Sequence, residues 1–266
     1  MSDTLWSVID SADDPRLAPF RLNERGLASR ADKRDDAGAG LFLAEGDLVV
    51  ERAFAAGCRP HLVLADGDRV PAITAELAGA GAAVFVGGDE VRQLVTGLGM
   101  PHPIVALFHR PARPSPSDLI GRCRRLVVAE GVDNPANVGS IVRNAAALGW
   151  DGLLLDHTSA DPLARRALRV AMGTAFSLPH ARTNDLAGAL RGAGDMTLYA
   201  LTPAATAHDI REITPADRCA VLIGSERAGL GDELVSMSTP VRIAMSGGVD
   251  SLNAAAAAAV ACFALA

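Results

Sequence analysis

Short apolar runs alternate with stretches of helical periodicity along the first 110 residues of this 266-residue chain. The apolar runs predict strands at 41–43, 61–64, 83–86 and 104–108. Between them, apolar residues recur at helical spacing in two segments, which predicts helices at 46–55 and 73–80. This part of the chain is therefore expected to fold as a small α/β module.

The second half of the chain shows the same alternation over a greater length. Strands are predicted at 126–129, 152–155, 197–201, 220–223 and 241–245. Helices are predicted at 138–148, 164–171 and 186–191, and a last helix is expected to begin at Ser251. Apolar strands that alternate with helices are typical of a parallel sheet covered on both faces. The predicted fold class is α/β, with ligands expected at the carboxyl ends of the strands.

A proline-rich segment separates the two halves. Residues 110–118 read Arg-Pro-Ala-Arg-Pro-Ser-Pro-Ser-Asp. Proline removes a backbone donor and holds the preceding residue in an extended conformation, so this composition is typical of a linker. We therefore predict a first domain at 1–110, a linker at 111–118 and a second domain at 119–266.

Composition narrows the class of protein. The hydrophobic content of 49% is ample for real cores, and the net charge of -6 argues against polyanion binding by the whole surface while leaving local basic patches open. Cys58, Cys123, Cys219 and Cys262 lie far apart, so they are expected to be core residues in a reducing compartment and not a zinc site or another metal site. The chain begins without an apolar signal-peptide core, and residues 254–266 are too few to span a bilayer. A cytoplasmic protein without membrane association is predicted.

Basic residues gather in two places. The segment before the first predicted strand carries Arg16, Arg21, Arg25, Arg30, Lys33 and Arg34. The predicted linker is flanked by Arg110, Arg113, Arg122, Arg124 and Arg125. Such charges form either a solvated surface or a strip that contacts phosphates, and the residues alone leave both interpretations open. The candidates for RNA contact are Arg21, Arg25, Arg30 and Arg34.

Polar residues follow three of the predicted strands. In the first cluster, 130–145, Asn137 is a candidate helix N-cap, while Arg143 alone is more typical of a surface or salt-bridge residue. In the second, 221–230, the glycine at the strand end allows close approach of a ligand to the backbone, and the acid two residues later also fits a capping role in a tight turn. In the third, 243–253, two glycines lead to Ser251, a second candidate N-cap.

The third cluster has two incompatible interpretations. From the left, residues 246–251 read Ser-Gly-Gly-Val-Asp-Ser, which resembles the phosphate loop of ATP pyrophosphatases. From the right, Ser251-Leu252-Asn253 opens a final helix. A pyrophosphatase needs further strands after its phosphate loop, and only 252–266 remain here, so the sequence favours the second interpretation.

In this order, the three clusters resemble the signature motifs of the SpoU/TrmH family of RNA ribose 2'-O-methyltransferases, members of the SPOUT superfamily. The motifs are Asn137-x-Gly139-x-x-x-Arg143, Gly224-x-Glu226-x-x-Gly229-Leu230 and Ile243-x-Met245-x-Gly247-x-x-x-Ser251-Leu252-Asn253. The resemblance covers about residues 120–266. Upstream, residues 41–46 (Leu-Phe-Leu-Ala-Glu-Gly) resemble the start of the ribosomal-protein-like substrate-binding domain that many members carry.

The resemblance implies a C-terminal parallel-sheet domain with a deep trefoil knot, preceded by a smaller RNA-binding domain. It implies methyl transfer from S-adenosylmethionine to a ribose 2'-hydroxyl, with 23S ribosomal RNA favoured over transfer RNA by analogy with members that carry the extra domain. It also implies a homodimer whose active site draws on both subunits. The expected catalytic residues are Arg143, Asn137, Glu226, Ser251 and Asn253. Cofactor contacts are expected near Leu201, Gly224, Ile243, Met245 and Leu252.

The sequence departs from the family pattern at three positions. Ala244 stands where the family usually has Pro, Ser225 where it has Asn, and Ala254 where it has Val. Because the expected catalytic residues are all present, an active enzyme with a slightly altered cofactor loop is predicted. Two alternatives stay open at this stage: an RNA-binding member that has lost catalysis, and an ATP-using enzyme that binds through the loop at residues 247–248.

Overall fold

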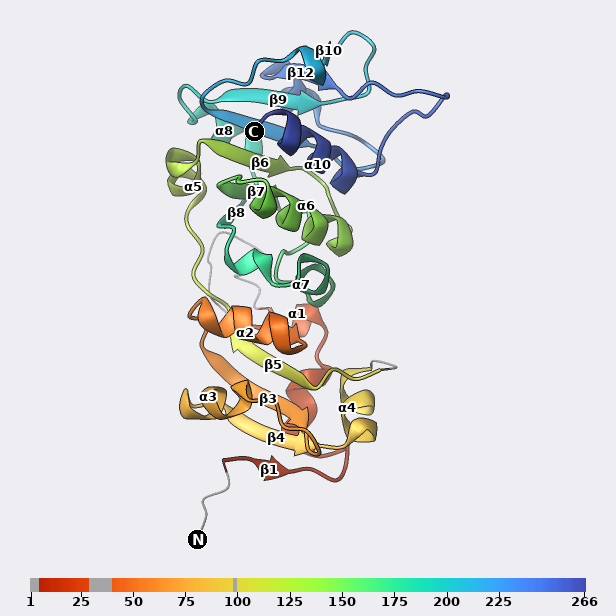
Figure 1. Ribbon diagram of the computed structural model, residues 1–266. Coiled ribbons are helices and arrows are strands. Elements are labelled where there is room, and N and C mark those ends of the chain that lie inside the picture. Colours follow the sequence, from red (N-terminus) through yellow and green to blue (C-terminus); the bar gives the residue numbers. More distant parts are fainter. Residues whose placement is uncertain (1–4, 29–39, 98–99) are drawn as a thin grey trace. The chain divides into compact units, whose positions relative to one another are not determined.

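Two compact units make up the chain in the computed structural model, which describes residues 5–28, 40–97 and 100–266. The first unit contains residues 1–112 together with 163–176, and the second contains 113–162 and 177–266 (Figure 1). The chain therefore passes between the units three times. The grouping of 163–176 with the first unit has no counterpart in the domain limits predicted from the sequence.

The first unit is built on a five-stranded sheet with the order β1-β4-β3-β5-β2. The strands are β1 Ser7–Val8, β2 Leu41–Glu45, β3 Pro60–Asp66, β4 Ala83–Gly87 and β5 Ile104–His109. β1, β4 and β3 are parallel to one another, whereas β5 runs antiparallel to both of its neighbours. The four strands that the apolar runs predict are therefore confirmed, each extended by one to three residues.

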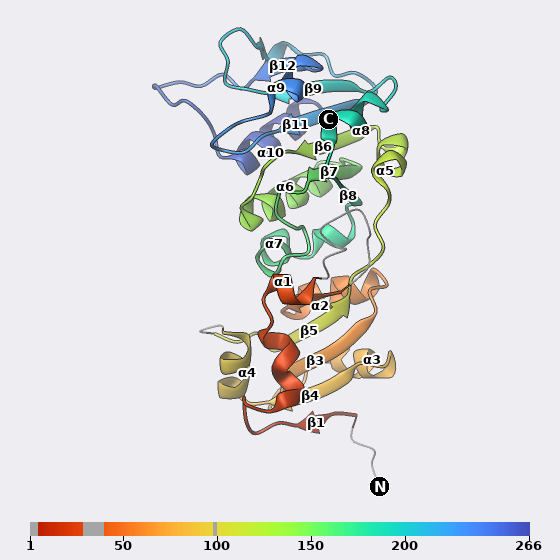
Figure 2. The same cartoon turned by 180° about the vertical axis from the view of Figure 1, so that it is seen from behind.

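Helices cover both faces of this sheet. One face carries α2 (Asp47–Ala55) and α3 (Ile73–Gly79), which lie in front of the sheet in Figure 1. The opposite face, seen in Figure 2, carries η1 (Pro15–Arg21), α1 (Glu24–Leu27) and α4 (Asp89–Thr96). Leucines, valines and phenylalanines of these last elements form one buried cluster with side chains of β2 to β5. The burial of this apolar area is the main force that holds the unit together.

The segment 163–176 completes the first unit. It contains α7 (Arg165–Ala171) and the short helix η3 (Thr174–Phe176), and α7 packs against β2. The guanidinium of Arg165 pairs with the buried carboxylate of Glu45 and donates a second hydrogen bond to the Thr96 carbonyl, at 2.7 Å. The ring of Phe176 lies 5.4 Å from that of Phe42. A buried carboxylate requires such a partner, so α7 is an integral part of this unit.

The second unit is built on a seven-stranded sheet with the order β10-β12-β9-β11-β6-β7-β8, in which every pairing is parallel. The strands are β6 Arg125–Ala129, β7 Gly152–Asp156, β8 His180–Thr183, β9 Thr197–Leu201, β10 His208–Asp209, β11 Cys219–Ile223 and β12 Thr239–Arg242. The predicted α/β class with a parallel sheet is confirmed. The order changes direction between β6 and β11, and ligands of such sheets bind at the carboxyl edge beside that point.

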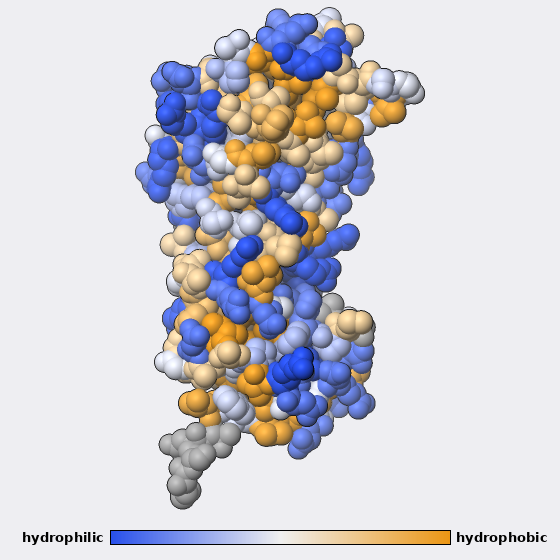
Figure 3. All heavy atoms as spheres, viewed as in Figure 1, coloured by the Kyte–Doolittle hydropathy of each residue, from blue (hydrophilic) through white to orange (hydrophobic). Residues whose placement is uncertain are grey.

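Both faces of this sheet are covered. On one face α6 (Pro135–Ala147) packs against α10 (Ala254–Ala264), and α10 also contacts β11. On the other face α5 (Pro116–Arg122), α8 (Leu186–Arg191) and α9 (Asp232–Ser236) share a buried cluster with strand residues. The short helix η4 (Ile210–Glu212) follows β10. One side of α10 stays uncovered in the single chain, because Val260 and Phe263 are exposed there, and Figure 3 shows hydrophobic residues gathered over this helix.

Several elements differ from their predicted limits for physical reasons. Helix α5 begins at Pro116 with Ser115 as its N-cap, so the last three residues of the predicted linker are helical. Strand β12 ends at Arg242, whereas 241–245 was predicted, because the chain leaves the ladder there to enter a loop. Strand β8 reads His-Ala-Arg-Thr and is buried although it contains no apolar run, so hydrophobic pattern could not reveal it.

All four cysteines are buried, as predicted for core residues. Burial raises the pKa of the Cys58 and Cys123 thiols to about 11 and that of Cys262 to about 12, which keeps these groups protonated and unreactive near neutral pH.

Among the described residues, no three side chains of His, Cys, Asp or Glu are placed to share a metal ion. Within the same residues, every helix is too short or too polar to cross a membrane.

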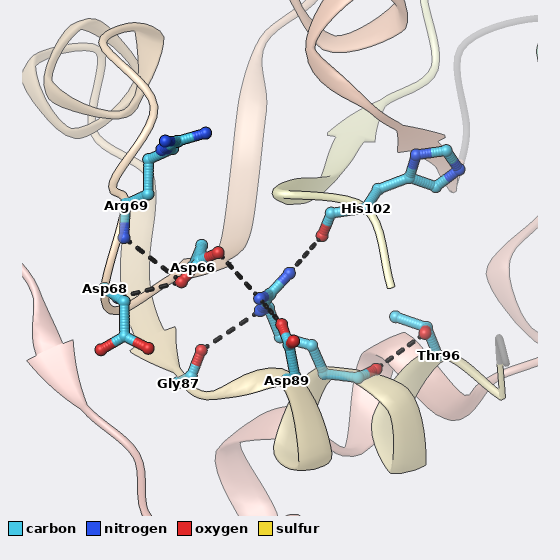
Figure 4. Close-up of polar contacts among 8 residues, drawn as sticks. Asp66, Asp68, Arg69, Gly87, Asp89, Thr96 and His102 are labelled. Atoms are coloured by element: carbon cyan, nitrogen blue, oxygen red, sulfur yellow. Dashed lines mark hydrogen bonds and ion pairs between the residues drawn. The ribbon is translucent and has the colours of Figure 1, made fainter. Parts of the chain in front are cut away.

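A buried guanidinium joins three segments at the carboxyl end of β3 and β4 in the first unit (Figure 4). Arg92 of α4 forms ion pairs with Asp66, at 2.9 Å, and with Asp89. It also donates hydrogen bonds to the carbonyl oxygens of Gly87, at 3.2 Å, and His102, at 2.6 Å. One side chain thereby fixes the end of both strands and the segment that leads into β5.

Replacement of Arg92 by Met should destabilise the first unit by about 2–3 kcal/mol, because it removes the charge-assisted hydrogen bonds of a buried guanidinium while preserving the apolar stem. Native-state hydrogen exchange of the β3 and β4 amides measures this free energy. Arg69→Ala is the matched control, since the Arg69 side chain is exposed and only its backbone bonds to Asp66. Equal protection in the two variants would contradict the assignment.

Candidate functional site

Three loops meet at the carboxyl edge of the parallel sheet in the second unit. They follow β6, β11 and β12, and they contain the three polar clusters identified in the sequence. β11 lies between β6 and β9, and β12 pairs with β9, so neighbouring parallel strands deliver the three loops to the same edge. This edge also holds a cavity of about 430 Å³.

The cavity is lined by loop and strand-end residues of β9, β11 and β12. All five residues predicted to contact a cofactor line it: Leu201, Gly224, Ile243, Met245 and Leu252. Two of the predicted catalytic residues, Glu226 and Ser251, line it as well. The ionisable side chains at its wall are Glu226, Arg227 and Asp250, and the remainder is largely apolar or backbone. The structure thus collects these motif residues in one place, while their binding role stays a prediction.

Gly224 has a structural task that the sequence did not reveal. Glycine at this strand end was expected to admit a ligand, but a side chain there would meet the chain itself. A Cβ atom on Gly224 would lie 2.1 Å from the carbonyl carbon of Gly229 and 2.3 Å from the nitrogen of Leu230. The loop folds back because the Gly229 N–H donates to the Ser225 carbonyl at 3.0 Å. Gly224 is therefore required for the loop to close.

The side-chain amide of Asn137 connects two of the three loops. Its Nδ2 donates to a carboxylate oxygen of Glu226, and its Oδ1 accepts a hydrogen bond of 3.0 Å from Nδ2 of Asn253. Asn137 is buried on α6, so both of its polar ends are satisfied within the protein. The structure therefore brings three of the predicted catalytic residues into direct contact.

Two predicted helix caps are wrong. The N-cap of α6 is Asn134, whose side chain accepts from the Ala136 N–H at 3.0 Å, because Pro135 fits the first helical position. Asn137 lies inside the helix, where its side chain is free for the contacts described above. The N-cap of α10 is Asn253, and Ser251 precedes it in the loop at the cavity. Asn253 thus caps a helix and contacts Asn137 at once.

Arg143 lies apart from these residues. It is exposed on α6, it is not among the residues that line the cavity, and it forms no hydrogen bond or ion pair with any described residue. The neighbouring Asn144 faces α10 instead and donates to the Ala255 carbonyl at 3.3 Å. A single chain therefore presents Arg143 as an unengaged cation on the surface of the second unit.

Sequence reasoning missed two carboxylates that shape the loops. Glu130 accepts a hydrogen bond of 2.6 Å from the Gly231 N–H and so anchors the end of the loop after β11. Asp156, at the end of β7, accepts from the Gly131 N–H at 3.0 Å and from the Ser159 hydroxyl at 2.5 Å. Burial of Asp156 would raise its pKa, but these hydrogen bonds outweigh burial and lower it. The sequence signal that could have revealed both residues is an acidic residue at the end of a buried apolar strand.

The basic segment near the N-terminus divides into bound and unbound residues. Arg16 pairs with Asp14 at 2.7 Å and lies over the ring of Phe85, so it is a structural residue. Arg21 and Arg25 are exposed. The other members of this group, Arg30, Lys33 and Arg34, lie outside the described residues.

The arginines that flank the predicted linker are largely engaged by their own units. Arg110 is only 6% exposed and donates to the Leu41 carbonyl at 3.1 Å. Arg125 donates to the carbonyl oxygens of Ala216 and Asp217, both at 2.8 Å. These two residues therefore stabilise the fold. They do not form an open strip for phosphate contacts around the linker.

Comparison with known proteins gives consistent matches in sequence and structure. A model of the SpoU rRNA Methylase family matches residues 124–263. An uncharacterized tRNA/rRNA methyltransferase of Mycobacterium tuberculosis is 38% identical, over 94% of this chain and 88% of that protein. The 23S rRNA (guanosine(2553)-2'-O)-methyltransferase RlmP of Bacillus subtilis is 26% identical, over 86% and 89%.

Two solved structures resemble the whole chain. The AdoMet-bound rRNA methyltransferase from Sinorhizobium meliloti has a TM-score of 0.82 at 25% identity and covers 98% of each chain. The SpoU methyltransferase AviRb from Streptomyces viridochromogenes, in complex with AdoMet, has a TM-score of 0.75 at 26% identity and covers 95% of this chain and 97% of that one. The likeness therefore includes the first unit as well as the second.

Replacement of Gly224 by Ala should destabilise the second unit by about 2–3 kcal/mol, because the added methyl group meets backbone atoms that have no free space to move into. Urea unfolding and hydrogen exchange of the amides at 228–231 measure the effect. Gly121→Ala is the matched control, since a Cβ atom at Gly121 meets nothing within 4 Å. A Gly224→Ala protein as stable as the control would show that the loop is not constrained in this way.

Proposed function

The chain belongs to the SpoU rRNA methylase family, which uses S-adenosylmethionine, and we propose that it transfers a methyl group from this cofactor to a ribose 2'-hydroxyl of 23S ribosomal RNA. The observation that carries the proposal is the cavity of about 430 Å³ at the carboxyl edge of the second sheet. Residues from the second and third signature motifs line it, and the Asn137 amide of the first motif binds Glu226 at its wall.

The cavity suits the cofactor in size and chemistry. Its volume falls within the range of roughly 300–1,000 Å³ that is typical of small-molecule sites. Leu201, Ile243, Met245 and Leu252 supply an apolar wall for an adenine ring, and the backbone around Gly224 supplies hydrogen-bonding groups. When bound, S-adenosylmethionine supplies a sulfonium methyl group as the electrophile.

The residues of this chain would position and polarise the ribose. Glu226, Asn137 and Asn253 form a hydrogen-bonded frame that holds the loop after β11 against α6 and the start of α10. Alignment of the 2'-oxygen by such a frame supplies much of the rate acceleration. Ser251, at the cavity wall, is placed to orient the substrate.

Arg143 is assigned to the ribose-phosphate. A guanidinium is protonated at any physiological pH, so it cannot act as an ordinary base. It can instead orient the phosphate and stabilise the alkoxide that develops on the 2'-oxygen, while the proton leaves through a local relay. This role requires Arg143 to reach a bound cofactor. Because Arg143 does not line the cavity of its own chain, it would act at the cavity of a second copy.

The absence of Arg143 from the cavity wall of its own chain supports a homodimer in which each active site draws on both copies. The uncovered side of α10 supports the same proposal. Ala256, Val260 and Phe263 lie at helical spacing on this side and are all exposed. An apolar stripe of this kind on a helix is typical of a surface that another protein covers. We also propose that the second unit contains the trefoil knot that the family implies, and that the protein acts in the cytoplasm.

The names of relatives favour ribosomal over transfer RNA. RlmP of Bacillus subtilis and a 23S rRNA (uridine(2479)-2'-O)-methyltransferase of Streptomyces viridochromogenes both act on 23S rRNA by name. Mapping of ribose methylation in RNA from cells with and without this gene identifies the target. If only transfer RNA lacks a methyl group in cells without the gene, transfer RNA is the substrate. If ribose methylation is unchanged in all RNA, the result favours a family member without catalytic activity.

Arg143→Lys should lower the turnover number at least about 10-fold, because lysine keeps the charge but loses the planar fork that binds two oxygens. The measurement is transfer of labelled methyl from S-adenosylmethionine to 23S rRNA at saturating RNA. The matched control is Arg191→Lys, since Arg191 is an exposed arginine of the second unit that pairs with Glu233. Unchanged turnover in Arg143→Lys would remove the assigned role.

Phe263→Glu should convert the dimer into a monomer at micromolar concentration, because it places a charge in the apolar stripe of α10. Phe263 is 75% exposed in the single chain, so the substitution leaves the fold intact. Light scattering after size-exclusion chromatography measures the mass. Leu94→Glu, at an apolar residue 65% exposed on α4 of the first unit, should remain dimeric. A wild-type monomer would reject the homodimer.

A further inference from the structure

A second cavity, of about 450 Å³, lies in the first unit. It is bounded by α1 and the residues just before it, by β2, and by the segment that leads into α7. The described residues that line it all belong to the first unit, so it is distinct from the cavity that would hold the cofactor. Its volume also falls within the range of small-molecule sites.

Among the described residues, the charge on the wall of this cavity is positive. Arg25, Arg110 and Arg165 line this part of the wall, where Glu24 supplies the single carboxylate. Two of the guanidinium groups are held in place: Arg110 by the Leu41 carbonyl and Arg165 by Glu45. Fixed guanidinium planes of this kind are suited to a ligand that needs both an electrostatic and a stacking partner.

Arg25 differs from the other two arginines. It is exposed on α1, and within the described part of the chain it forms no hydrogen bond or ion pair. Its charge is therefore available to an anion, while Arg110 and Arg165 are already engaged within the protein. A ligand would gain a charge-assisted contact from Arg25 without first breaking one inside the protein.

The wall also has an apolar component. Leu22, Leu41, Leu43 and Leu163 line it, and Leu22 is exposed just before α1. A cavity that combines guanidinium groups with a leucine wall matches a molecule with a flat, weakly polar part and a negative part. A nucleotide has this character, because its base stacks on apolar or guanidinium surfaces and its phosphate pairs with arginine.

We propose that this cavity of the first unit binds one unpaired nucleotide of the RNA substrate, with its base against Leu22 and Leu41 and its phosphate at Arg25. The proposal rests on the RNA substrate of the proposed function. An unpaired nucleotide is assigned because a base within a duplex must leave its stack before it can enter a cavity. Since the two cavities share no lining residue, the nucleotide bound here is assigned to anchoring the RNA and not to receiving the methyl group.

An anchor that acts in binding has a kinetic signature. Arg25→Ala should raise the Kd for 23S rRNA and the KM for methylation by about fivefold to tenfold, and leave the turnover number at saturating RNA unchanged. The slope of log affinity against log salt should fall by about one. Arg69→Ala, which removes an exposed arginine of the same unit outside the cavity, should match the wild type within twofold.

A second measurement needs no methyl transfer. Methyl resonances of labelled leucine in the full chain are followed while a randomised single-stranded RNA octamer is added, and then a short RNA duplex. The octamer should shift Leu22 and Leu41 in the wild type, it should need a fivefold to tenfold higher concentration to do so in Arg25→Ala, and the duplex should leave both unmoved.

The outcomes separate the two proposals. A wild-type protein that methylates no RNA would reject the proposed function, while the octamer titration still tests the cavity. An active enzyme in which Arg25→Ala has the wild-type Kd, KM and salt slope would overturn the nucleotide site. Leu22 and Leu41 resonances that stay unmoved at saturating octamer, or that move equally with duplex, would overturn it as well.

Discussion

The side-chain amide of Asn137 is the interaction on which the architecture of the site depends. An amide carries one donor group and one acceptor, and here the donor binds Glu226 while the acceptor binds Asn253. These partners belong to the loop after β11 and to the start of α10, so a single buried group ties α6 to two segments that lie 89 and 116 residues further along the chain. Aspartate would repel Glu226, and a shorter side chain would leave two polar groups without partners. Few other residues satisfy both contacts.

The sequence predicted much of this architecture, because hydrophobic periodicity marks elements that are buried on one or both faces. The apolar strands of both sheets lie within a few residues of their predicted positions, and the three motifs meet at one sheet edge. Periodicity could not reveal β8, because its buried residues include the polar side chains of His180, Arg182 and Thr183. It also misplaced both helix caps, because two candidate capping residues stood within three positions of each other and only tertiary contacts distinguish them.

Backbone geometry explains why the glycine-rich segments looked ambiguous. A glycine before a helix fits a phosphate loop, a tight turn or a close chain crossing equally well. Gly224 belongs to the last kind, since its neighbour across the loop is the backbone of Gly229. Gly247 and Gly248 both have positive φ and lead to residues that line the cavity, so they shape a loop that presents Ser251 and Leu252. Spacing in sequence does not distinguish these cases, because the deciding partner lies far along the chain or across the loop.

The grouping of residues 163–176 with the first unit has a consequence for the order of events during synthesis. A ribosome that has released the first 112 residues has not yet made Arg165, the cation that pairs with Glu45, nor Phe176, the ring that packs on Phe42. The nascent first unit would therefore hold an uncompensated carboxylate at the edge of its core for the several seconds that translation of the next 64 residues requires, at about 5–20 residues per second. By then β6, α6 and β7 have also emerged. The first unit therefore cannot be completed until the beginning of the second has been made, because residues 113–162 precede 163–176 in the chain.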